Sequence, residues 1–154
     1  MGTTIYFDLD GTLYDLYNIE NWEQKLREEM PNMYNQDRPL YTPRIHTIVS
    51  ALLRLGVKFH SITKLSMTAT ENYAKLTTEE KKEWVRNNLP FVSNINCIPY
   101  TDHKYKYIRR KDEENILIDD SEYECSDWTG TAYKAENNIE DILEKILKDL
   151  TGAS

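Results

Sequence analysis

The sequence predicts an α/β fold, in which a parallel β-sheet carries helices on both of its faces. Short apolar runs alternate along the chain with amphipathic helical stretches, and this alternation is typical of parallel sheets. Three of the runs end at a polar residue, namely Asp8, Thr63 and Asp119. Because ligands bind such sheets beyond the carboxyl ends of the strands, we expect these three side chains to meet at one edge.

Length and composition indicate one acidic domain. The chain has 154 residues and a formal net charge of −7, so we expect a single domain over residues 1–154. Charges of both signs are scattered along it, which does not suit binding along a nucleic-acid backbone. Cys97 and Cys125 are far apart and form no CxxC motif, which is typical of reduced thiols in a cytoplasmic protein. No apolar run reaches the length of about 18 residues that marks a membrane span, and no signal-peptide pattern is present.

The first expected strand, residues 4–7, leads directly into two carboxylates. Asp8 and Asp10 are two positions apart, so an extended backbone places them on the same side. Two negative charges this close are costly unless they share a cation or a proton. Gly11 permits a tight turn, and Thr12 can hydrogen-bond within it. The alternative is a solvated acidic turn, but an apolar strand that runs straight into D-x-D-G-T favours a functional site.

Residues 16–40 are expected to form a small insert. Its apolar residues recur at helical spacing on one face, and they are Ile19, Trp22, Leu26, Met30 and Met33. Pro31 is expected to interrupt this helix near Met30. We favour an amphipathic helix that packs at the edge of the domain. The alternative is a cap beside the site, in which aromatic side chains stack on a substrate ring.

The next stretch predicts a helix and then the second strand, residues 57–62. The helix signals are Thr42 as N-cap, Pro43 in the first turn and Gly56 at the stop.

The second half of the chain predicts two further helices and three further strands. Thr77-Thr78-Glu79-Glu80 has the pattern of a capping box, so a helix is expected from there to about Asn88. A strongly amphipathic helix is expected between Asn138 and Gly152. The expected strands are residues 95–98, 115–118 and 131–134.

The string DLDGTLYD at Asp8–Asp15 resembles the first motif of the haloacid dehalogenase (HAD) superfamily of phosphotransferases. This resemblance implies a Rossmann-like three-layer sandwich with strand order 3-2-1-4-5 and a small helical cap. It implies that Asp8 is the nucleophile toward phosphorus and that Asp10 is the general acid and base. Asp8, Asp119 and Asp10, the last through its backbone carbonyl, would bind Mg²⁺, which prefers such oxygen ligands. Asp120 would lie in the second shell and orient these ligands.

The same resemblance assigns the phosphate contacts. Thr63 lies where the second motif has a Ser or Thr that hydrogen-bonds the phosphoryl group. Lys104 is our choice for the lysine of the third motif, which offsets the negative charge of nucleophile and phosphate. Lys106 is the rival, and the basic run 103–111 can equally form a solvated surface. Lys81 is either an additional phosphate contact or a surface lysine.

Within the superfamily, the chain is most similar to the 5′(3′)-deoxyribonucleotidases. The stretches that carry this similarity are Asp8–Asp15, Glu80–Val85 and Lys104 through Asp119-Asp120. The similarity implies Mg²⁺-dependent hydrolysis of a small phosphomonoester, foremost a deoxyribonucleoside monophosphate, through an aspartyl-phosphate. We expect neither a membrane nor a nucleic acid as partner, and leave a homodimer open. The rival functions are a phosphatase for nucleic-acid 3′ ends or phosphoproteins, and a non-catalytic binding protein that retains the fold.

Overall fold

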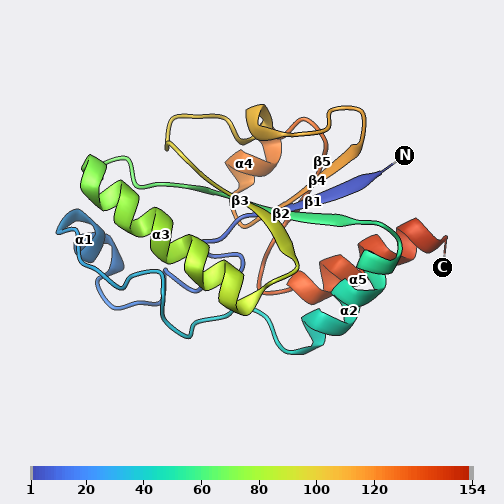
Figure 1. Cartoon of the computed structure of the whole chain (residues 1–154), viewed down its shortest axis with the longest axis horizontal. Coiled ribbons are helices and arrows are strands. Elements are labelled where there is room, and N and C mark those ends of the chain that lie inside the picture. The colour runs from blue at the N-terminus through green and yellow to red at the C-terminus, as the bar shows by residue number, and fades with distance from the viewer. Residues whose placement is uncertain (1, 153–154) are drawn as a thin grey trace.

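One parallel β-sheet forms the centre of the molecule (Figure 1). Its strands are β1 (Thr3–Phe7), β2 (Lys58–Lys64), β3 (Val92–Ile98), β4 (Glu114–Asp119) and β5 (Thr131–Lys134). The computed structural model describes residues 2–152, and within them the strands are ordered β3-β2-β1-β4-β5. Every neighbouring pair is parallel. The predicted fold class and strand order are therefore confirmed.

The central strand β1 sets the position of the acids. All five of its residues are buried, because strands flank it on both sides and both faces of the sheet are covered. Its last residue, Phe7, pairs with Ser61 of β2 and with Ile118 of β4. Asp8 directly follows Phe7, and Asp119 directly follows Ile118. The register therefore brings these two acids level at the carboxyl edge of the sheet.

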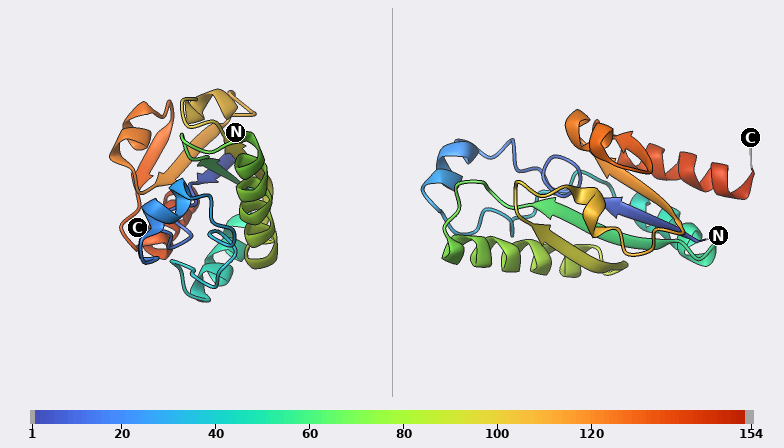
Figure 2. Two further views of the ribbon diagram at one scale, coloured as in Figure 1. Left: turned by 90° about the vertical axis from the view of Figure 1, so that its left-hand side faces the viewer. Right: turned by 90° about the horizontal axis from the view of Figure 1, so that it is seen from above.

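Helices cover the two faces of the sheet unequally, as Figure 1 and Figure 2 show. One face carries the long helices α2 (Arg44–Arg54), α3 (Glu71–Asn88) and α5 (Ile139–Thr151). Their apolar sides pack on Phe7 and Phe59 in the main core. The other face carries the short helices η1 (Lys104–Tyr107) and α4 (Glu122–Asp127), over a smaller cluster around Tyr6 and Leu117. The molecule is thus the three-layer sandwich that was expected, with one thin layer.

Two predicted helix starts were wrong. Helix α3 begins at Glu71, six residues before Thr77, where the expected capping box begins. Its N-cap is Thr70, which accepts a hydrogen bond from the backbone N–H of Tyr73. Thr77 is instead buried inside the helix, where its hydroxyl donates to the Tyr73 carbonyl at 3.0 Å. Helix α2 begins at Arg44 with Pro43 as its N-cap, one residue later than expected, although the hydroxyl of Thr42 still accepts from the Arg44 N–H at 3.3 Å.

The insert contains one short helix, α1 (Trp22–Arg27), and is otherwise irregular. The predicted helical face is therefore only partly formed: Leu26 is buried, whereas Met30 is 43% exposed. The chain turns out of the helix through left-handed conformations at Glu29 and Asn32, whose φ angles are 57° and 65°. Figure 2 shows α1 beyond the arrowheads of the strands, so the insert lies next to the carboxyl edge of the sheet.

Helix α3 holds the insert in place through side-chain hydrogen bonds to its backbone. The hydroxyl of Tyr73 donates to the Met30 carbonyl at 2.7 Å, and the indole of Trp84 donates to the Gln36 carbonyl at 2.9 Å. The Glu80 carboxylate accepts from the backbone N–H of Asn32 at 2.8 Å. These contacts make the insert a fixed wall of the domain. None of the helices within residues 2–152 has the length and apolarity that a bilayer crossing requires.

Candidate active site

The acids that end β1 and β4 meet at one ammonium group. The Nζ of Lys104 lies 2.9 Å from the Oδ1 of Asp8 and 2.7 Å from the Oδ2 of Asp119. Lys104 itself is 3% exposed, because η1 carries it down onto the strand ends. Asp8, Asp119 and Asp120 each offer a carboxylate oxygen, and these three oxygens lie within 4.8 Å of one another. The structure therefore brings Asp8, Asp119 and Lys104 together, as the sequence led us to expect.

Thr12 connects the loop after β1 to the loop after β4. Its hydroxyl lies 3.1 Å from the Oδ2 of Asp8 and 3.3 Å from the Oδ1 of Asp120, and it accepts from the Asp120 backbone N–H at 3.0 Å. Gly11, just before it, has a φ of 80°, and a Cβ there would collide with the Asp120 carboxylate. Only glycine satisfies both the left-handed backbone and the close approach. This turn sets the separation of the three acids.

A second buried lysine reaches the site from α3. The Nζ of Lys81 donates to the Thr63 hydroxyl at 2.9 Å, to the Lys64 carbonyl at 3.1 Å and to the Oδ2 of Asp10 at 3.3 Å. It also lies 4.5 Å from the centre of the Tyr34 ring, and the residue is 1% exposed. The alternative of a surface lysine at this position is therefore wrong. Thr63 and Asp10 meet at this ammonium group.

The sequence carried a signal for Lys81 that we did not use. It lies on the inward face of α3, three residues before Trp84 and four residues after Thr77, and both of these are buried. A lysine at such a position must find a partner when the helix packs, because an unpaired buried charge is costly.

Asp10 stands apart from the other three acids. Its Oδ2 contacts Lys81, and its Oδ1 is buried without a hydrogen-bond partner among the described residues. Burial raises the pKa of this carboxyl, and the neighbouring Lys81 ammonium counteracts the effect. A carboxyl with a raised pKa, free of the acid cluster, is suited to donate and accept protons.

Burial and neighbouring charges shift the pKa values of the other ionisable groups in the site. Burial raises the pKa of Asp119 and of Asp120, and the negative charge of Asp8 raises both further. For Lys104 burial acts to lower the pKa, but the carboxylates of Asp8 and Asp119 outweigh it, so the pKa is raised and the ammonium form persists. Four carboxylates face two ammonium groups, so the fully ionised site has two negative charges in excess.

This arrangement fits a divalent cation. The excess of two negative charges matches the charge of Mg²⁺, and three converging carboxylates are the hard oxygen ligands that this ion prefers. Asp120 was expected to stand behind the ligands, but its carboxylate oxygen belongs to the same triad as those of Asp8 and Asp119. Asp120 is therefore a further candidate ligand beside Asp8 and Asp119.

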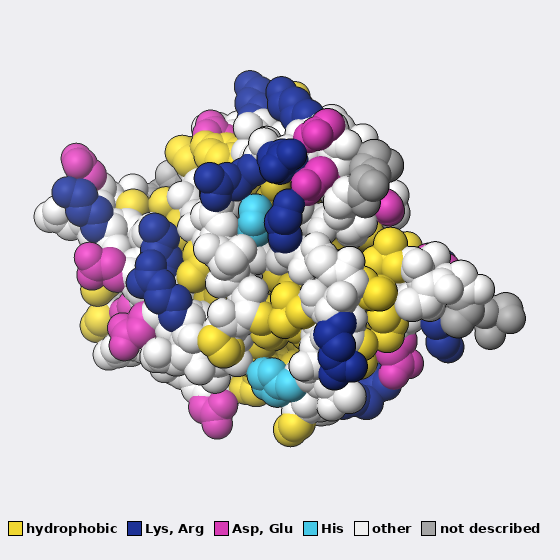
Figure 3. Space-filling view, turned by 45° about the vertical axis from the view of Figure 1, so that its right-hand side comes forward, with side chains coloured by type: hydrophobic (Ala, Val, Ile, Leu, Met, Phe, Trp, Pro, Cys, Tyr) yellow, Lys and Arg dark blue, Asp and Glu magenta, His cyan; other side chains and the backbone are white. Residues whose placement is uncertain are grey.

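The structure separates the two lysines that compete for the third motif. Lys104 is buried on the acids, whereas Lys106 is exposed. Most of the basic run lies on the surface as well, and Arg110 pairs there with Asp112 at 3.6 Å. On the face drawn in Figure 3, lysine and arginine side chains are interspersed with acidic ones and do not gather into one broad basic surface.

A cleft of about 870 Å³ opens over the acids. One side is formed by the insert, including Tyr17, Trp22 and Tyr34. Other parts are formed by residues 65–68 after β2 and by residues that follow β3 and β4. The latter include Tyr100 and Tyr123, which we did not single out from the sequence. Tyr100 lies in a loop and Tyr123 in the short helix α4, and neither segment is long enough for a periodic pattern to mark them.

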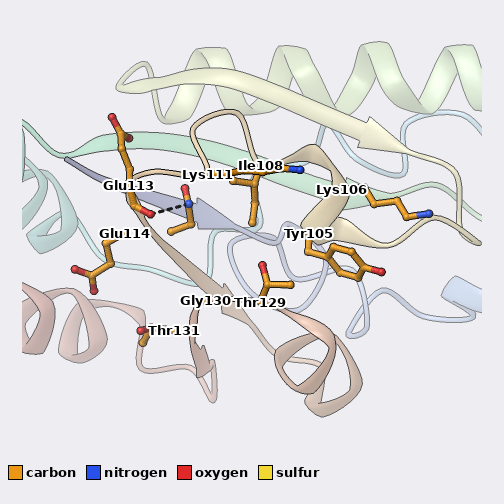
Figure 4. Close-up of a pocket in the computed structure, with 10 residues that line it drawn as sticks. Tyr105, Lys106, Ile108, Lys111, Glu113, Glu114, Thr129, Gly130 and Thr131 are labelled. Carbon is orange, nitrogen blue, oxygen red and sulfur yellow. Dashed lines mark hydrogen bonds between the residues drawn. The ribbon is translucent and has the colours of Figure 1, made fainter. Parts of the chain in front are cut away.

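A second cavity, of about 490 Å³, lies at the other end of β4 (Figure 4). Asn115 and Thr131, near the starts of β4 and β5, line it together with Lys106 and Lys111. None of Asp8, Asp10, Asp119 or Lys104 borders it. The cleft over the acids is therefore the candidate active site.

Comparison with protein-family models gives no match, and comparison with the curated proteins gives no relative.

Proposed function

We propose that this protein is a Mg²⁺-dependent phosphomonoesterase that acts through an aspartyl-phosphate on Asp8. The observation that carries the proposal is the division of labour among the acids. Asp8 shares the Lys104 ammonium with Asp119, whereas Asp10, two residues later, is held separately by Lys81. Two neighbouring carboxyl groups with different environments are suited to two different roles.

In the first half of the reaction, an oxygen of Asp8 attacks phosphorus and the bond from phosphorus to the ester oxygen breaks. The leaving oxygen takes the proton from the Asp10 carboxyl, so the alcohol departs neutral. In the second half, water attacks the phosphorus of the aspartyl-phosphate and gives a proton to the Asp10 carboxylate. The bond from phosphorus to the Asp8 oxygen breaks, inorganic phosphate leaves, and both acids return to their starting states.

The other polar groups at the edge have roles in binding. Lys104 offsets the negative charge of Asp8, which otherwise repels a phosphate dianion. Lys81 and the Thr63 hydroxyl, 2.9 Å apart, offer donors to the phosphoryl oxygens. Asp8, Asp119 and Asp120 would hold the Mg²⁺ ion, with the Asp10 backbone carbonyl as a further ligand. When bound, the ion supplies charge neutralisation for the approaching phosphate and for the transition state.

A small phosphorylated metabolite is the substrate that the cleft supports best, and a deoxyribonucleoside monophosphate is our leading candidate. The cleft has the volume of a small-molecule site, and several of its lining residues are aromatic. The formal net charge of −7 does not favour a long nucleic acid.

The Asp8→Asn protein tests the proposal. With Mg²⁺ present, we expect the wild-type protein to hydrolyse a generic phosphomonoester and the variant to lose at least about a thousandfold in kcat. Wild-type turnover should also disappear when the metal is chelated. The exposed Asp112→Asn protein is the matched control and should retain full turnover. Near-normal turnover by Asp8→Asn, or none by the wild-type protein on a panel of monophosphates, contradicts the proposal.

A further inference from the structure

A group of four residues on the cleft, which we call the tyrosine wall, has no role in the chemistry above. It consists of Lys64, Tyr100, Tyr123 and Glu124, and all four line the cleft. The Nζ of Lys64 lies 5.8 Å from the centre of the Tyr100 ring and 5.6 Å from that of Tyr123. The same ammonium pairs with the Oε2 of Glu124 at 2.9 Å. One cation thus holds two aromatic rings and one carboxylate together.

Exposed apolar side chains gather at this cleft. Nine large apolar side chains are exposed within residues 2–152, and four of them line it. These four are Tyr17 (46%), Met67 (67%), Tyr100 (52%) and Tyr123 (61%). Exposed apolar groups that border one cavity mark a binding surface. Charged groups at the bottom and apolar groups at the rim fit a ligand with an anionic head and a flat apolar body.

The tyrosine wall is better suited to hold that body than the insert is. On the insert, Tyr34 is only 3% exposed, so its ring has no surface free for stacking. Tyr17 packs edge-on against Trp22, with ring centres 4.9 Å apart. Tyr100 and Tyr123 are more than half exposed, and each has the Lys64 ammonium beside its ring. Their rings therefore have surface free for stacking.

The wall also offers a hydrogen-bond donor and an acceptor side by side. The Lys64 ammonium has three N–H groups, and Glu124 accepts one of them. Glu124 is only 8% exposed. Its Oε1 is buried and has no hydrogen-bond partner among the described residues. A buried oxygen without a partner is costly, and a ligand N–H would satisfy it. A ring that carries a carbonyl next to an N–H matches this pair.

The wall is also close to the phosphate end of the site along the chain. Lys64 follows Thr63 directly, and the Lys64 carbonyl accepts a hydrogen bond from Lys81. Thr63 and the tyrosine wall line the same cleft, so a molecule that places its phosphate at Thr63 can extend toward the wall.

We propose that the tyrosine wall binds the heteroaromatic ring of the substrate's leaving group, and so selects nucleoside monophosphates over sugar phosphates. This inference rests on the proposed phosphomonoesterase activity. It assigns base recognition to the segments after β2, β3 and β4, and not to the insert.

Two substrates that share the same sugar and phosphate isolate the ring. These are thymidine 5′-monophosphate, whose base has a carbonyl next to an N–H, and 2-deoxyribose 5-phosphate, which carries no base. We expect the wild-type kcat/KM for the nucleotide to exceed that for the sugar phosphate by at least about tenfold, the order expected for one stacked ring. In a Tyr100→Ala/Tyr123→Ala protein this ratio should fall at least about tenfold.

Two further variants make the comparison specific. Tyr17→Ala removes an exposed ring from the insert and should change the ratio less than the double variant does. Leu55→Ala removes an exposed side chain just after α2, away from the cleft, and should leave the ratio at its wild-type value. Circular dichroism would confirm that all variants are folded. The Kd of thymidine 5′-monophosphate, measured on Asp8→Asn protein, should rise with the double substitution.

The outcomes distinguish this inference from the function on which it rests. If neither compound is hydrolysed, the proposed activity is wrong, and the Kd values on Asp8→Asn protein then decide whether the wall binds the ring. If both compounds are hydrolysed and the double variant keeps the wild-type ratio, the inference alone is overturned. A larger drop in the ratio for Tyr17→Ala than for the double variant would place the ring on the insert and overturn it as well.

Discussion

The ammonium group of Lys81 lies 2.9 Å from the hydroxyl of Thr63, and this contact connects the middle of α3 to the end of β2. The site therefore has two buried lysines with different partners. Lys104 forms ion pairs with Asp8 and Asp119, whereas Lys81 contacts Asp10 and Thr63. A helix thus completes a site whose other main groups come from strand ends and from the turn of η1.

Replacing Lys81 with Met should reduce both stability and turnover. The substitution leaves the Asp10 carboxylate buried without its cation, and breaking a buried ion pair from one side costs about 3–5 kcal/mol. Urea unfolding would measure this loss, and kcat on a generic phosphomonoester should fall at least about tenfold in the fraction that remains folded. Lys82→Met is the matched control on the next residue and should change neither quantity. Wild-type unfolding free energy in Lys81→Met would refute the role of this pair.

Lys104 and Lys106 should differ sharply when each is changed to Met. The Lys104 ammonium contacts the carboxylates of Asp8 and Asp119, so its removal should lower kcat/KM for a phosphomonoester at least about a hundredfold. Lys106 is exposed two residues away, and its variant should stay within about twofold of the wild-type value. Steady-state kinetics in Mg²⁺ measures both. A comparable loss in the two proteins would show that the basic segment acts as a whole.

Asp120→Asn should raise the stability of the metal-free protein at pH 8 and weaken its response to Mg²⁺. The pKa of Asp120 in the folded state is raised above its unfolded value near 3.9 by burial and by Asp8. The folded protein therefore binds more protons than the unfolded chain, and stability declines as the pH rises from about 4 toward 8. Asparagine cannot ionise, so its variant avoids this decline.

Thermal unfolding with and without Mg²⁺ measures this effect. At pH 8 the metal-free variant should have a Tm at least about 2 °C above the wild-type protein. Saturating Mg²⁺ should raise the wild-type Tm more than that of the variant, because the ion stabilises the state to which it binds. Asp112→Asn serves as the control and should behave as wild type. An equal Mg²⁺ response in Asp120→Asn would remove Asp120 from the set of metal ligands.

His60 should make the protein less stable in mild acid. It is 7% exposed, its Nδ1 is buried without a hydrogen-bond partner among residues 2–152, and it contacts the Tyr6 ring edge-on at 5.1 Å. Burial lowers its pKa, and the positive charges of Arg109 and Lys58 lower it further. As the pH falls through about 6.5, His60 is protonated in the unfolded chain but stays neutral in the folded protein. The unfolded state then binds more protons, so the stability of the folded protein falls below about pH 6.5.

A His60→Leu protein isolates this contribution, because leucine is apolar and cannot be protonated. Unfolding free energies measured by urea between pH 7 and pH 5 should decline less steeply in His60→Leu than in the wild-type protein. The exposed His46→Gln protein is the control and should keep the wild-type slope. Identical slopes in all three proteins would mean that other groups set the acid sensitivity.

The parts of the structure that could be predicted depend on local pattern. An apolar run that ends in an acid is visible in the sequence, and the rule for parallel sheets places such ends together, so Asp8, Thr63 and Asp119 were found without coordinates. Helix starts were less certain, because Thr70 and Thr77 are both good N-cap residues. Packing of the Thr77 hydroxyl inside α3 decided between them.

The sequence by itself determined the parallel sheet, its order of elements and the acids at its carboxyl edge, since strand periodicity and strand ends are properties of neighbouring residues. Only the tertiary structure decided that Lys104 and not Lys106 reaches the acids, that Lys81 is buried on Asp10 and Thr63, and that Tyr100 and Tyr123 flank Lys64. Those contacts join segments that are far apart along the chain, and their geometry depends on how α3, η1 and the loops pack against the sheet.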